Sequence, residues 1–231
     1  MRFKDRVDAG QKLAEALAHY KDQRPIVLAL PRGGVPVAAE VALALDAPLD
    51  IILVRKIGAQ MQPELALGAV VDGGKPVVVR NQEVIDATGT TDAEFEVIRD
   101  QELAEIERQR ARFLGGRQAL NPEGRVVIVV DDGIATGATM RAALEATRQR
   151  NPKKLILAVP VAPNGTMNTL RRETDENVCL GNLDPYGSVG HFYTDFRQTS
   201  DREVIDLLAR YGPERSGSAP MKVGASDDGQ C

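Results

Sequence analysis

The chain has 231 residues, of which 43% are hydrophobic and 27% charged, and its formal net charge is −4. This length suffices for one domain with a sizeable core, and the negative charge argues against a nucleic-acid-binding protein. No apolar run approaches the roughly 20 residues of a membrane span, and the stretch MRFKDRVDAG lacks the apolar segment of a signal peptide. The two cysteines and two histidines lack zinc-site spacing, so we expect a cytoplasmic protein without a structural metal, a membrane or a nucleic-acid partner.

The first 45 residues predict a helix, a buried strand and a second helix. Apolar residues recur at helical spacing over residues 5–20, and Ile26–Leu30 has the continuous apolar pattern of a strand buried on both faces. Pro36 near the first turn supports a helix over Val35–Leu45. The apolar residues that share the predicted face of the first helix are Val7, Leu13, Leu17 and Tyr20.

The turn Pro31-Arg32-Gly33-Gly34 lies between that strand and the second helix, and it has the composition of an anion-binding loop. Arg32 offers a bidentate donor, and the two glycines permit unusual backbone angles. On these residues alone a purely structural turn is the more common case. If a second ligand-binding loop lies beside it, the turn would form half of one ligand site.

A third strand is predicted over Leu49–Val54, and it runs into the adjacent cations Arg55 and Lys56. Two cations at the carboxyl end of a strand suit a diphosphate ligand. A solvated strand end has the same composition and is the alternative.

The next segment predicts a β-hairpin and then a long helix. The apolar runs Ala69–Val71 and Val77–Val79 flank the turn DGGK. A helix capped by Thr91 or Asp92 extends to about Leu114, with apolar residues in one narrow sector and a charged remainder. This helix needs no functional interpretation.

The stretch Val126–Arg141, VVIVVDDGIATGATMR, is the most informative part of the chain. A buried parallel strand ends in Asp131 and Asp132, at the sheet edge where ligands of open α/β folds bind. The turn Ala135–Thr139 then opens a helix whose unpaired N–H groups and dipole favour a phosphate. A sugar phosphate satisfies both the carboxylates and the turn; the alternative is a capped turn beside a solvated acidic pair.

The remaining elements complete one α/β domain over residues 1–212, with a doubly wound, mainly parallel sheet. The tail, residues 213–231, lacks apolar periodicity and is predicted to be disordered. The predicted elements after the central stretch are a strand over Leu155–Val161, a helix over Asn164–Arg172, a strand over Val178–Leu180 and a helix over Glu203–Tyr211.

The segment Gly181–Gln198 is rich in aromatic residues among glycines and aspartates. Such residues can line a flat site for a planar ring, or they can form a small satellite core under a loop. The residues alone favour the satellite core. The aromatic residues of this segment are Tyr186, Phe192, Tyr193 and Phe196.

The hydrophobic strand, acidic pair and T-G-x-T turn resemble the ribose-phosphate motif of the type I phosphoribosyltransferases. The stretches ALPRGGVPVA, VRKIGA, PELALGAV and DFRQTSDREV are similar to an uncharacterised bacterial branch of that family. The resemblance covers residues 1 to about 212 and implies the family's fold. It also implies transfer of the phosphoribosyl group of 5-phosphoribosyl-1-pyrophosphate (PRPP) to a nitrogen acceptor, with pyrophosphate as the leaving group.

The resemblance assigns roles to residues on both loops. It implies that Asp131 and Asp132 hold the ribose hydroxyls and, through water, Mg²⁺. It places Arg32 and Lys56 with the acidic pair as catalytic residues, and it implies a cis peptide between Pro31 and Arg32 with Arg32 facing the cleft below Asp131. The residues that it assigns to the 5-phosphate are Ala135, Thr136, Gly137, Ala138 and Thr139, and those that it assigns to pyrophosphate are Arg32, Gly33, Gly34, Arg55 and Lys56.

The resemblance further implies a β-hairpin and lid insertion, with Ala59–Glu64 as a mobile lid that excludes water. It implies a small hood over residues 181–198, in which Tyr186, Phe192, Tyr193 and Phe196 cover an acceptor base. A homodimer is also expected from the family.

One departure concerns the acceptor. Relatives that act on 6-oxopurines usually carry an acid directly before the T-G-x-T turn, where this chain has Ala135. Hypoxanthine and guanine are therefore less expected than other nitrogen heterocycles. The alternatives to a transferase are a non-catalytic regulator that binds PRPP or a nucleotide, and an enzyme that uses PRPP outside base salvage.

Overall fold

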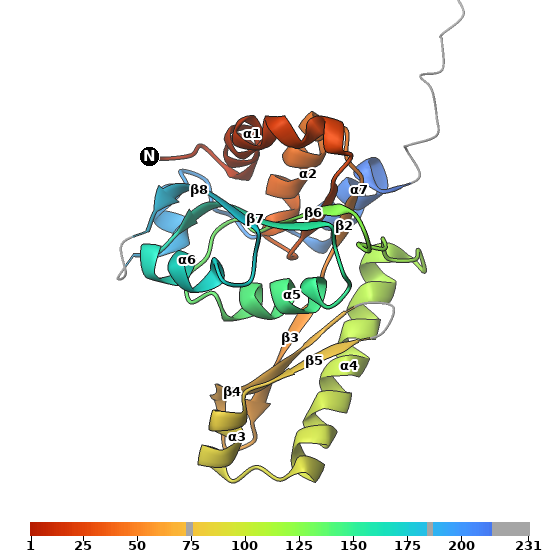
Figure 1. Ribbon diagram of the computed structural model, residues 1–231, viewed down its shortest axis with the longest axis vertical. Coiled ribbons are helices and arrows are strands. Elements are labelled where there is room, and N and C mark those ends of the chain that lie inside the picture. The colour runs from red at the N-terminus through yellow and green to blue at the C-terminus, as the bar shows by residue number, and fades with distance from the viewer. Residues whose placement is uncertain (73–75, 184–186, 214–231) are drawn as a thin grey trace, which may run out of the picture.

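The computed structural model describes residues 1–72, 76–183 and 187–213, which form a domain and an arm that projects from it (Figure 1). The domain contains a five-stranded parallel sheet, and the arm contains a three-stranded antiparallel sheet. The strands of the parallel sheet, in spatial order, are β2 (Leu49–Ile51), β1 (Ile26–Ala29), β6 (Val126–Val130), β7 (Lys154–Ala162) and β8 (Glu176–Asn182).

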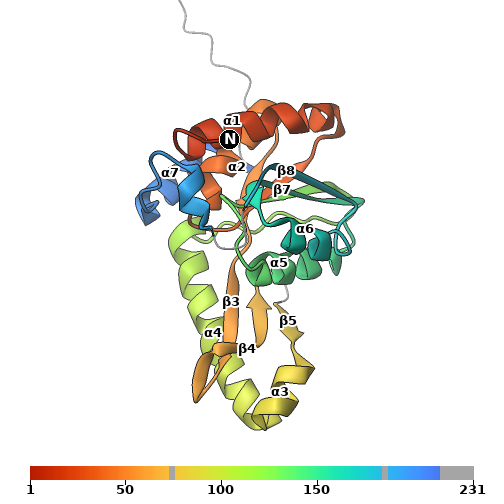
Figure 2. The ribbon, with the colours of Figure 1, turned by 90° about the vertical axis from the view of Figure 1, so that its left-hand side faces the viewer.

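Helices cover both faces of the parallel sheet, which confirms the doubly wound fold (Figures 1 and 2). Alternate residues of β6 point to opposite faces, so Ile128 packs in one core cluster and Val129 in the other. One face carries α1 (Arg6–Leu17), α2 (Gly34–Leu45) and α7 (Asp201–Tyr211), and the other carries α5 (Ala138–Arg148) and α6 (Asn164–Leu170).

The strands β1 and β6 are neighbours, and the chain leaves them toward opposite ends of the sheet. Their register pairs Ala29 with Val130, so the loops that follow the two strands emerge side by side. Such a switch in strand order opens a crevice at the carboxyl edge, where ligands of open α/β folds bind. The fold therefore brings together the two loops that the sequence marks as anion-binding.

The arm confirms the predicted β-hairpin, because Ala69 pairs with Val79 and Val71 with Val77 in an antiparallel ladder. Thr91 caps the long helix with a reciprocal capping box to Glu94. The arm extends away from the parallel sheet (Figure 2). Its elements are β3 (Val54–Ala59), β4 (Gln62–Val71), β5 (Val77–Arg80), α3 (Gln82–Thr88) and α4 (Asp92–Leu114).

Two predictions that concern β3, the first strand of the arm, are wrong. The strand predicted over Leu49–Val54 ends at Ile51, and Val54 already belongs to the antiparallel sheet. The loop predicted over Ala59–Glu64 is instead the tip of a hairpin between β3 and β4, with Gln60 and Met61 as its turn. The sequence does not indicate where the chain passes from one sheet to the other, because every residue of the apolar run IILV, residues 51–54, is common in strands.

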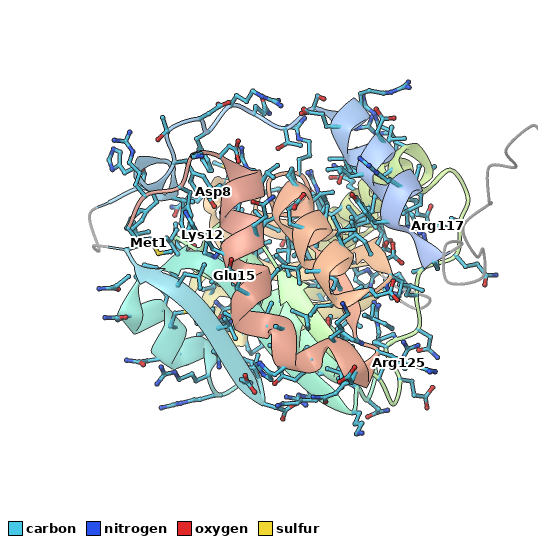
Figure 3. The ribbon with its side chains drawn as sticks, turned by 90° about the horizontal axis from the view of Figure 1, so that it is seen from above. Met1, Asp8, Lys12, Glu15, Arg117 and Arg125 are labelled. Atoms are coloured by element: carbon cyan, nitrogen blue, oxygen red, sulfur yellow. The ribbon has the colours of Figure 1, made fainter. Side chains whose placement is uncertain are left out.

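The first helix begins at Arg6, where Asp5 accepts a hydrogen bond from the Asp8 N–H group. Its core face consists of Ala9, Gly10, Leu13, Ala14 and Leu17, whereas Val7 is 43% exposed, contrary to the prediction. The short 3-10 helix η1 (Ala18–Gln23) directly follows α1. A second 3-10 helix, η2 (Val189–Phe192), lies between β8 and α7. Figure 3 looks onto this layer and shows Asp8, Lys12 and Glu15 along α1.

Some predictions lie outside the described residues, namely the disordered tail beyond residue 213 and the placement of Tyr186. Among the residues that the structure does describe, no helix combines the length and the apolar character needed to cross a bilayer.

Ser200 and Glu203 form a reciprocal cap at the start of α7, and the contribution of this cap to stability can be tested. The Ser200 hydroxyl accepts a hydrogen bond from the Glu203 N–H group, and the Glu203 carboxylate accepts one from the Ser200 N–H group. We expect Ser200→Ala to lower the free energy of unfolding by about 1 kcal/mol, measured by urea denaturation. Ser200→Thr keeps the accepting oxygen and serves as the control; equal losses in both variants would contradict the capping role.

Candidate functional site

The loops after β1 and β6 touch closely enough that neither glycine of the first loop could carry a side chain. A Cβ atom on Gly33 would lie 2.1 Å from the Asp132 Oδ2 atom, and one on Gly34 would lie 2.9 Å from the Asp131 Cα atom. Gly33 has an ordinary φ of −61°. Close approach, rather than unusual backbone geometry, is therefore what requires glycine here.

Each carboxylate of the acidic pair has one oxygen engaged within the protein. The Asp132 N–H group donates to Asp131 Oδ1 at 2.8 Å, and the Arg6 Nε–H group donates to Asp132 Oδ2 at 2.8 Å. No other residue of the described chain hydrogen-bonds Asp131 Oδ2 or Asp132 Oδ1. Two acceptor atoms thus remain for a ligand that presents two donors, as a vicinal diol does.

Burial raises the pKa of the Asp131 carboxyl well above its usual range, and the neighbouring charge of Asp132 raises it further. Burial also raises the pKa of Asp132, and the Arg6 guanidinium opposes that shift. The folded state is therefore less stable when both carboxyl groups are ionised. A ligand that donates hydrogen bonds to them relieves part of this cost.

The turn after the acidic pair forms an open cup at the N-terminus of α5. Gly137 has a φ of +81° and precedes the first helical residue, Ala138, while Thr136 and Thr139 are exposed. A Cβ atom on Gly137 would lie 2.5 Å from the Thr166 methyl group, so a side chain here is strained in two ways. The first N–H groups of a helix have no partners within it, so this turn has the features of the anion site that the sequence predicts.

The cup opens on a hollow of about 700 Å³ whose other wall is α6 and the end of β8. Arg141 is the one charged residue among the described residues that line it. The Thr166 hydroxyl donates to the Ala135 carbonyl at 3.3 Å and joins the two walls. The polar side chains that face this hollow are Thr136, Asn164, Thr166, Thr169 and Asn182.

Arg32 lies in the loop between β1 and α2. The Pro31–Arg32 peptide is cis, as the resemblance implied. The Arg32 Nη1 atom lies 3.4 Å from Asp201 Oδ1 at the start of α7, and Arg112 of α4 binds the same carboxylate at 2.7 Å. Arg32 is thus held in an ion pair with α7 at the rim of the site, rather than against the acidic pair.

The structure separates Arg55 and Lys56, which the sequence placed together at a strand end. Both residues lie within β3, where neighbouring side chains point to opposite faces of the sheet. Arg55 Nε donates to Glu102 of α4 at 2.7 Å, whereas Lys56 lines a hollow of about 530 Å³ that also includes Thr139 and Arg141. This geometry directs Lys56, and not Arg55, toward the helix that carries the cup.

The aromatic segment contributes a satellite core behind the acidic pair. Tyr193 is buried, its ring lies 5.4 Å from that of Phe3, and its hydroxyl donates to the Asp132 carbonyl at 2.6 Å. Burial and the charge of Asp132 both raise the pKa of Tyr193, which keeps it a neutral donor. Phe192 packs beside this cluster, and Phe196 is 36% exposed with its ring stacked on Tyr193.

Sequence reasoning missed Arg6, which contacts both the acidic pair and the aromatic segment. Its guanidinium lies 2.7 Å from Asp132 Oδ2 and 4.0 Å from the centre of the Phe196 ring. These partners are more than 120 positions away along the chain. No local pattern could have indicated the contact, because it arises only when α1 packs beside the loop after β6.

The two carboxylates are the groups of the site that could hold a divalent cation together with a ligand. Among the described residues, no three His, Cys, Asp or Glu side chains form a metal cluster. Mg²⁺ commonly binds through one or two carboxylates together with waters and substrate phosphates. The free oxygens of Asp131 and Asp132 fit that mode.

Comparison with known proteins gives a consistent result. Residues 4–180 match the family described as phosphoribosyl transferase domain. Two Mycobacterium tuberculosis proteins, MT0597 of strain CDC 1551 and Rv0571c of strain H37Rv, carry names that assign them provisionally to the phosphoribosyl transferases. Each is 44% identical over 208 residues, which cover 90% of this chain and 46% of the relative. This chain therefore spans about half the length of the curated relatives that it matches.

A solved structure agrees over nearly the whole chain. The crystal structure of TT1426 from Thermus thermophilus is similar with a TM-score of 0.80 and 39% identity. The alignment covers 92% of this chain and 100% of that one.

The buried acidic pair predicts an unusual pH dependence of stability. Because the pKa of Asp131 is raised in the folded state, the native protein binds more protons than the unfolded chain above the unfolded pKa, near 3.8. The contribution of Asp131 to stability is therefore lost as pH rises through its raised pKa. We expect Asp131→Asn to increase the free energy of unfolding at pH 7 relative to the wild type, and to do so less at pH 4.

This change is measured by urea denaturation at both pH values. Asp206→Asn, at an exposed position on α7, provides the matched control. A loss of stability at pH 7 in Asp131→Asn would contradict the electrostatic cost.

Proposed function

Because the chain belongs to the phosphoribosyl transferase family, we propose that it transfers the 5-phosphoribosyl group of PRPP to a nitrogen acceptor and releases pyrophosphate, with Mg²⁺ as cofactor. One observation carries the proposal. Two carboxylate oxygens that accept no hydrogen bond from a described residue lie at the same sheet edge as the open cup at the N-terminus of α5. This is the donor and acceptor pattern that complements a ribose diol joined to a phosphate.

The proposed reaction requires little covalent help from the protein. Its transition state has oxocarbenium character, so catalysis consists of holding the ribose phosphate, neutralising the leaving group and excluding water. The cup, residues 135–139, binds the 5-phosphate, and Asp131 and Asp132 bind the hydroxyls. Asp131 and Asp132 would hold Mg²⁺, which would supply positive charge for the leaving group.

The leaving pyrophosphate has donors on the other loop. The Gly33 amide and the Arg32 guanidinium belong to the loop after β1, beside the acidic pair, whereas the Gly34 N–H group donates to the Leu30 carbonyl at 3.1 Å and must release it to bind a ligand. Lys56 approaches from β3 through the hollow that includes Thr139. Arg32 must leave Asp201 to reach the ligand, and this exposed ion pair at 3.4 Å is weak enough to exchange.

The acceptor is a nitrogen heterocycle in this proposal. The hollow of about 700 Å³ beside the cup is lined by amide and hydroxyl groups, and Arg141 is the one charge among its described lining residues. Ala135 stands where an acid would accept a proton from a 6-oxopurine. The acceptor is therefore one that needs no carboxylate at that position.

The second candidate is a regulator that binds PRPP or a nucleotide without turnover. It is favoured by the ion pair with Asp201, which holds Arg32 away from the acidic pair and so away from the position of a leaving pyrophosphate. One assay separates the candidates: the protein is incubated with PRPP, Mg²⁺ and a panel of heterocyclic bases, and pyrophosphate release is followed. Saturable PRPP binding with no base-dependent release would favour the regulator; failure to bind PRPP would exclude both.

The acidic pair provides the mutational test. We expect the double variant Asp131→Asn, Asp132→Asn to reduce kcat/KM at least about 100-fold, since two charge-assisted hydrogen bonds to the transition state are lost. If the protein is a regulator, the same variant weakens PRPP binding instead. Asp206→Asn is the control, and near-normal turnover in the double variant would defeat the assignment.

A further inference from the structure

Arg6 connects the acidic pair to the aromatic segment through four contacts. Its Nε and Nη2 atoms lie 2.8 Å and 2.7 Å from the same oxygen, Asp132 Oδ2. Its Nη1 atom donates to the Arg197 carbonyl at 2.7 Å, and its guanidinium carbon lies 4.0 Å from the centre of the Phe196 ring. The Arg6 side chain is only 12% exposed, so these contacts fix it in place.

The geometry differs from that of an ion pair that serves stability alone. Arginine and a carboxylate usually pair as two forks, with each of two N–H groups facing its own oxygen. Here both N–H groups converge on Oδ2 and leave Oδ1 of Asp132 without a donor from any described residue. An ion pair that only stabilised the fold would be stronger if it used both carboxylate oxygens. The ion pair between Arg6 and Asp132 instead leaves one acceptor atom open to the crevice.

Asp132 is held from two further sides. The Tyr193 hydroxyl donates to its backbone carbonyl, and a Cβ atom on Gly33 would lie 2.1 Å from Oδ2, so the loop after β1 leaves no room on that side. The contact with Arg6 and the loop after β1 therefore fix the orientation of the carboxylate, with one oxygen directed at the protein. Only Oδ1 remains for a ligand.

We propose that Arg6 is a positioning residue for the sugar-binding carboxylate: it holds Asp132 Oδ2 so that Oδ1 faces a ribose hydroxyl. This inference rests on the proposed binding of a ribose phosphate at the acidic pair. Phe196 and the Arg197 carbonyl hold Arg6 in turn, which gives the C-terminal segment a role in sugar recognition. Arg6 itself does not touch the reacting atoms.

The test measures how strongly the site recognises the diol, independently of any acceptor. Isothermal titration calorimetry compares ribose 5-phosphate with 2,3-dideoxyribose 5-phosphate, which keeps the ring and the phosphate but lacks both hydroxyls. Inorganic phosphate reports on the cup alone. The proteins are the wild type, Arg6→Met and Arg6→Lys, with Arg202→Met on the exposed face of α7 as the matched control.

We expect the wild type and Arg202→Met to prefer ribose 5-phosphate by about tenfold or more, the equivalent of one hydrogen bond to a charged group. Arg6→Met loses most of that preference while its affinity for inorganic phosphate stays unchanged. Arg6→Lys, which keeps the charge but has no planar fork, gives an intermediate preference. A general loss of folded protein would lower all affinities together and would not change the ratio.

An undiminished preference in folded Arg6→Met overturns the inference. If circular dichroism shows that Arg6→Met is unfolded, Arg6→Lys decides the matter: a reduced preference supports the role, and a wild-type preference overturns it. A wild-type protein that binds PRPP but shows no preference for the diol also overturns it. A wild-type protein that binds neither PRPP nor ribose 5-phosphate instead refutes the proposed function on which the inference rests.

Discussion

The contact between two loops that have no room for a Cβ atom is the constraint on which the site depends. Neighbouring parallel strands place the loop with Gly33 and Gly34 directly against the loop with Asp131 and Asp132. Glycine lets the first loop fill the space beside the carboxylates, which excludes water from one side of them. The acidic pair is thereby buried enough to raise the pKa of both groups, yet each keeps one oxygen that no described residue binds.

That arrangement is costly for folding and useful for binding. Charged groups that lose water without full compensation destabilise a fold, and such costs concentrate at functional sites. Arg6 offsets part of the cost at Asp132 and does so from a buried, stacked position. No described cation contacts Asp131, so its charge is the least compensated of the pair and the one that a ligand stabilises most.

The sequence predicts those parts of the structure whose signals are local. Buried apolar runs identify β1, β6 and β7, and the capping residue Thr91 identifies the start of α4. The switch from β2 to β3 is missed, because the run IILV has no residue that marks a change of sheet. The contact between Arg6 and Asp132 is missed for a different reason: it depends on how two distant elements pack.

The two halves of the site differ in how firmly their charged groups are held. Asp132 is fixed by Arg6 in a largely buried pair, at 2.7 Å, with side chains 12% and 15% exposed. Arg32 is held by Asp201 at 3.4 Å, and its side chain is 43% exposed. Because Arg112 also binds Asp201, at 2.7 Å, that carboxylate keeps a cation when Arg32 departs. A buried pair resists rearrangement, whereas an exposed, long pair exchanges at little cost. For a ligand of the proposed kind, the sugar half of the site is therefore preorganised and the leaving-group half adapts to its occupant.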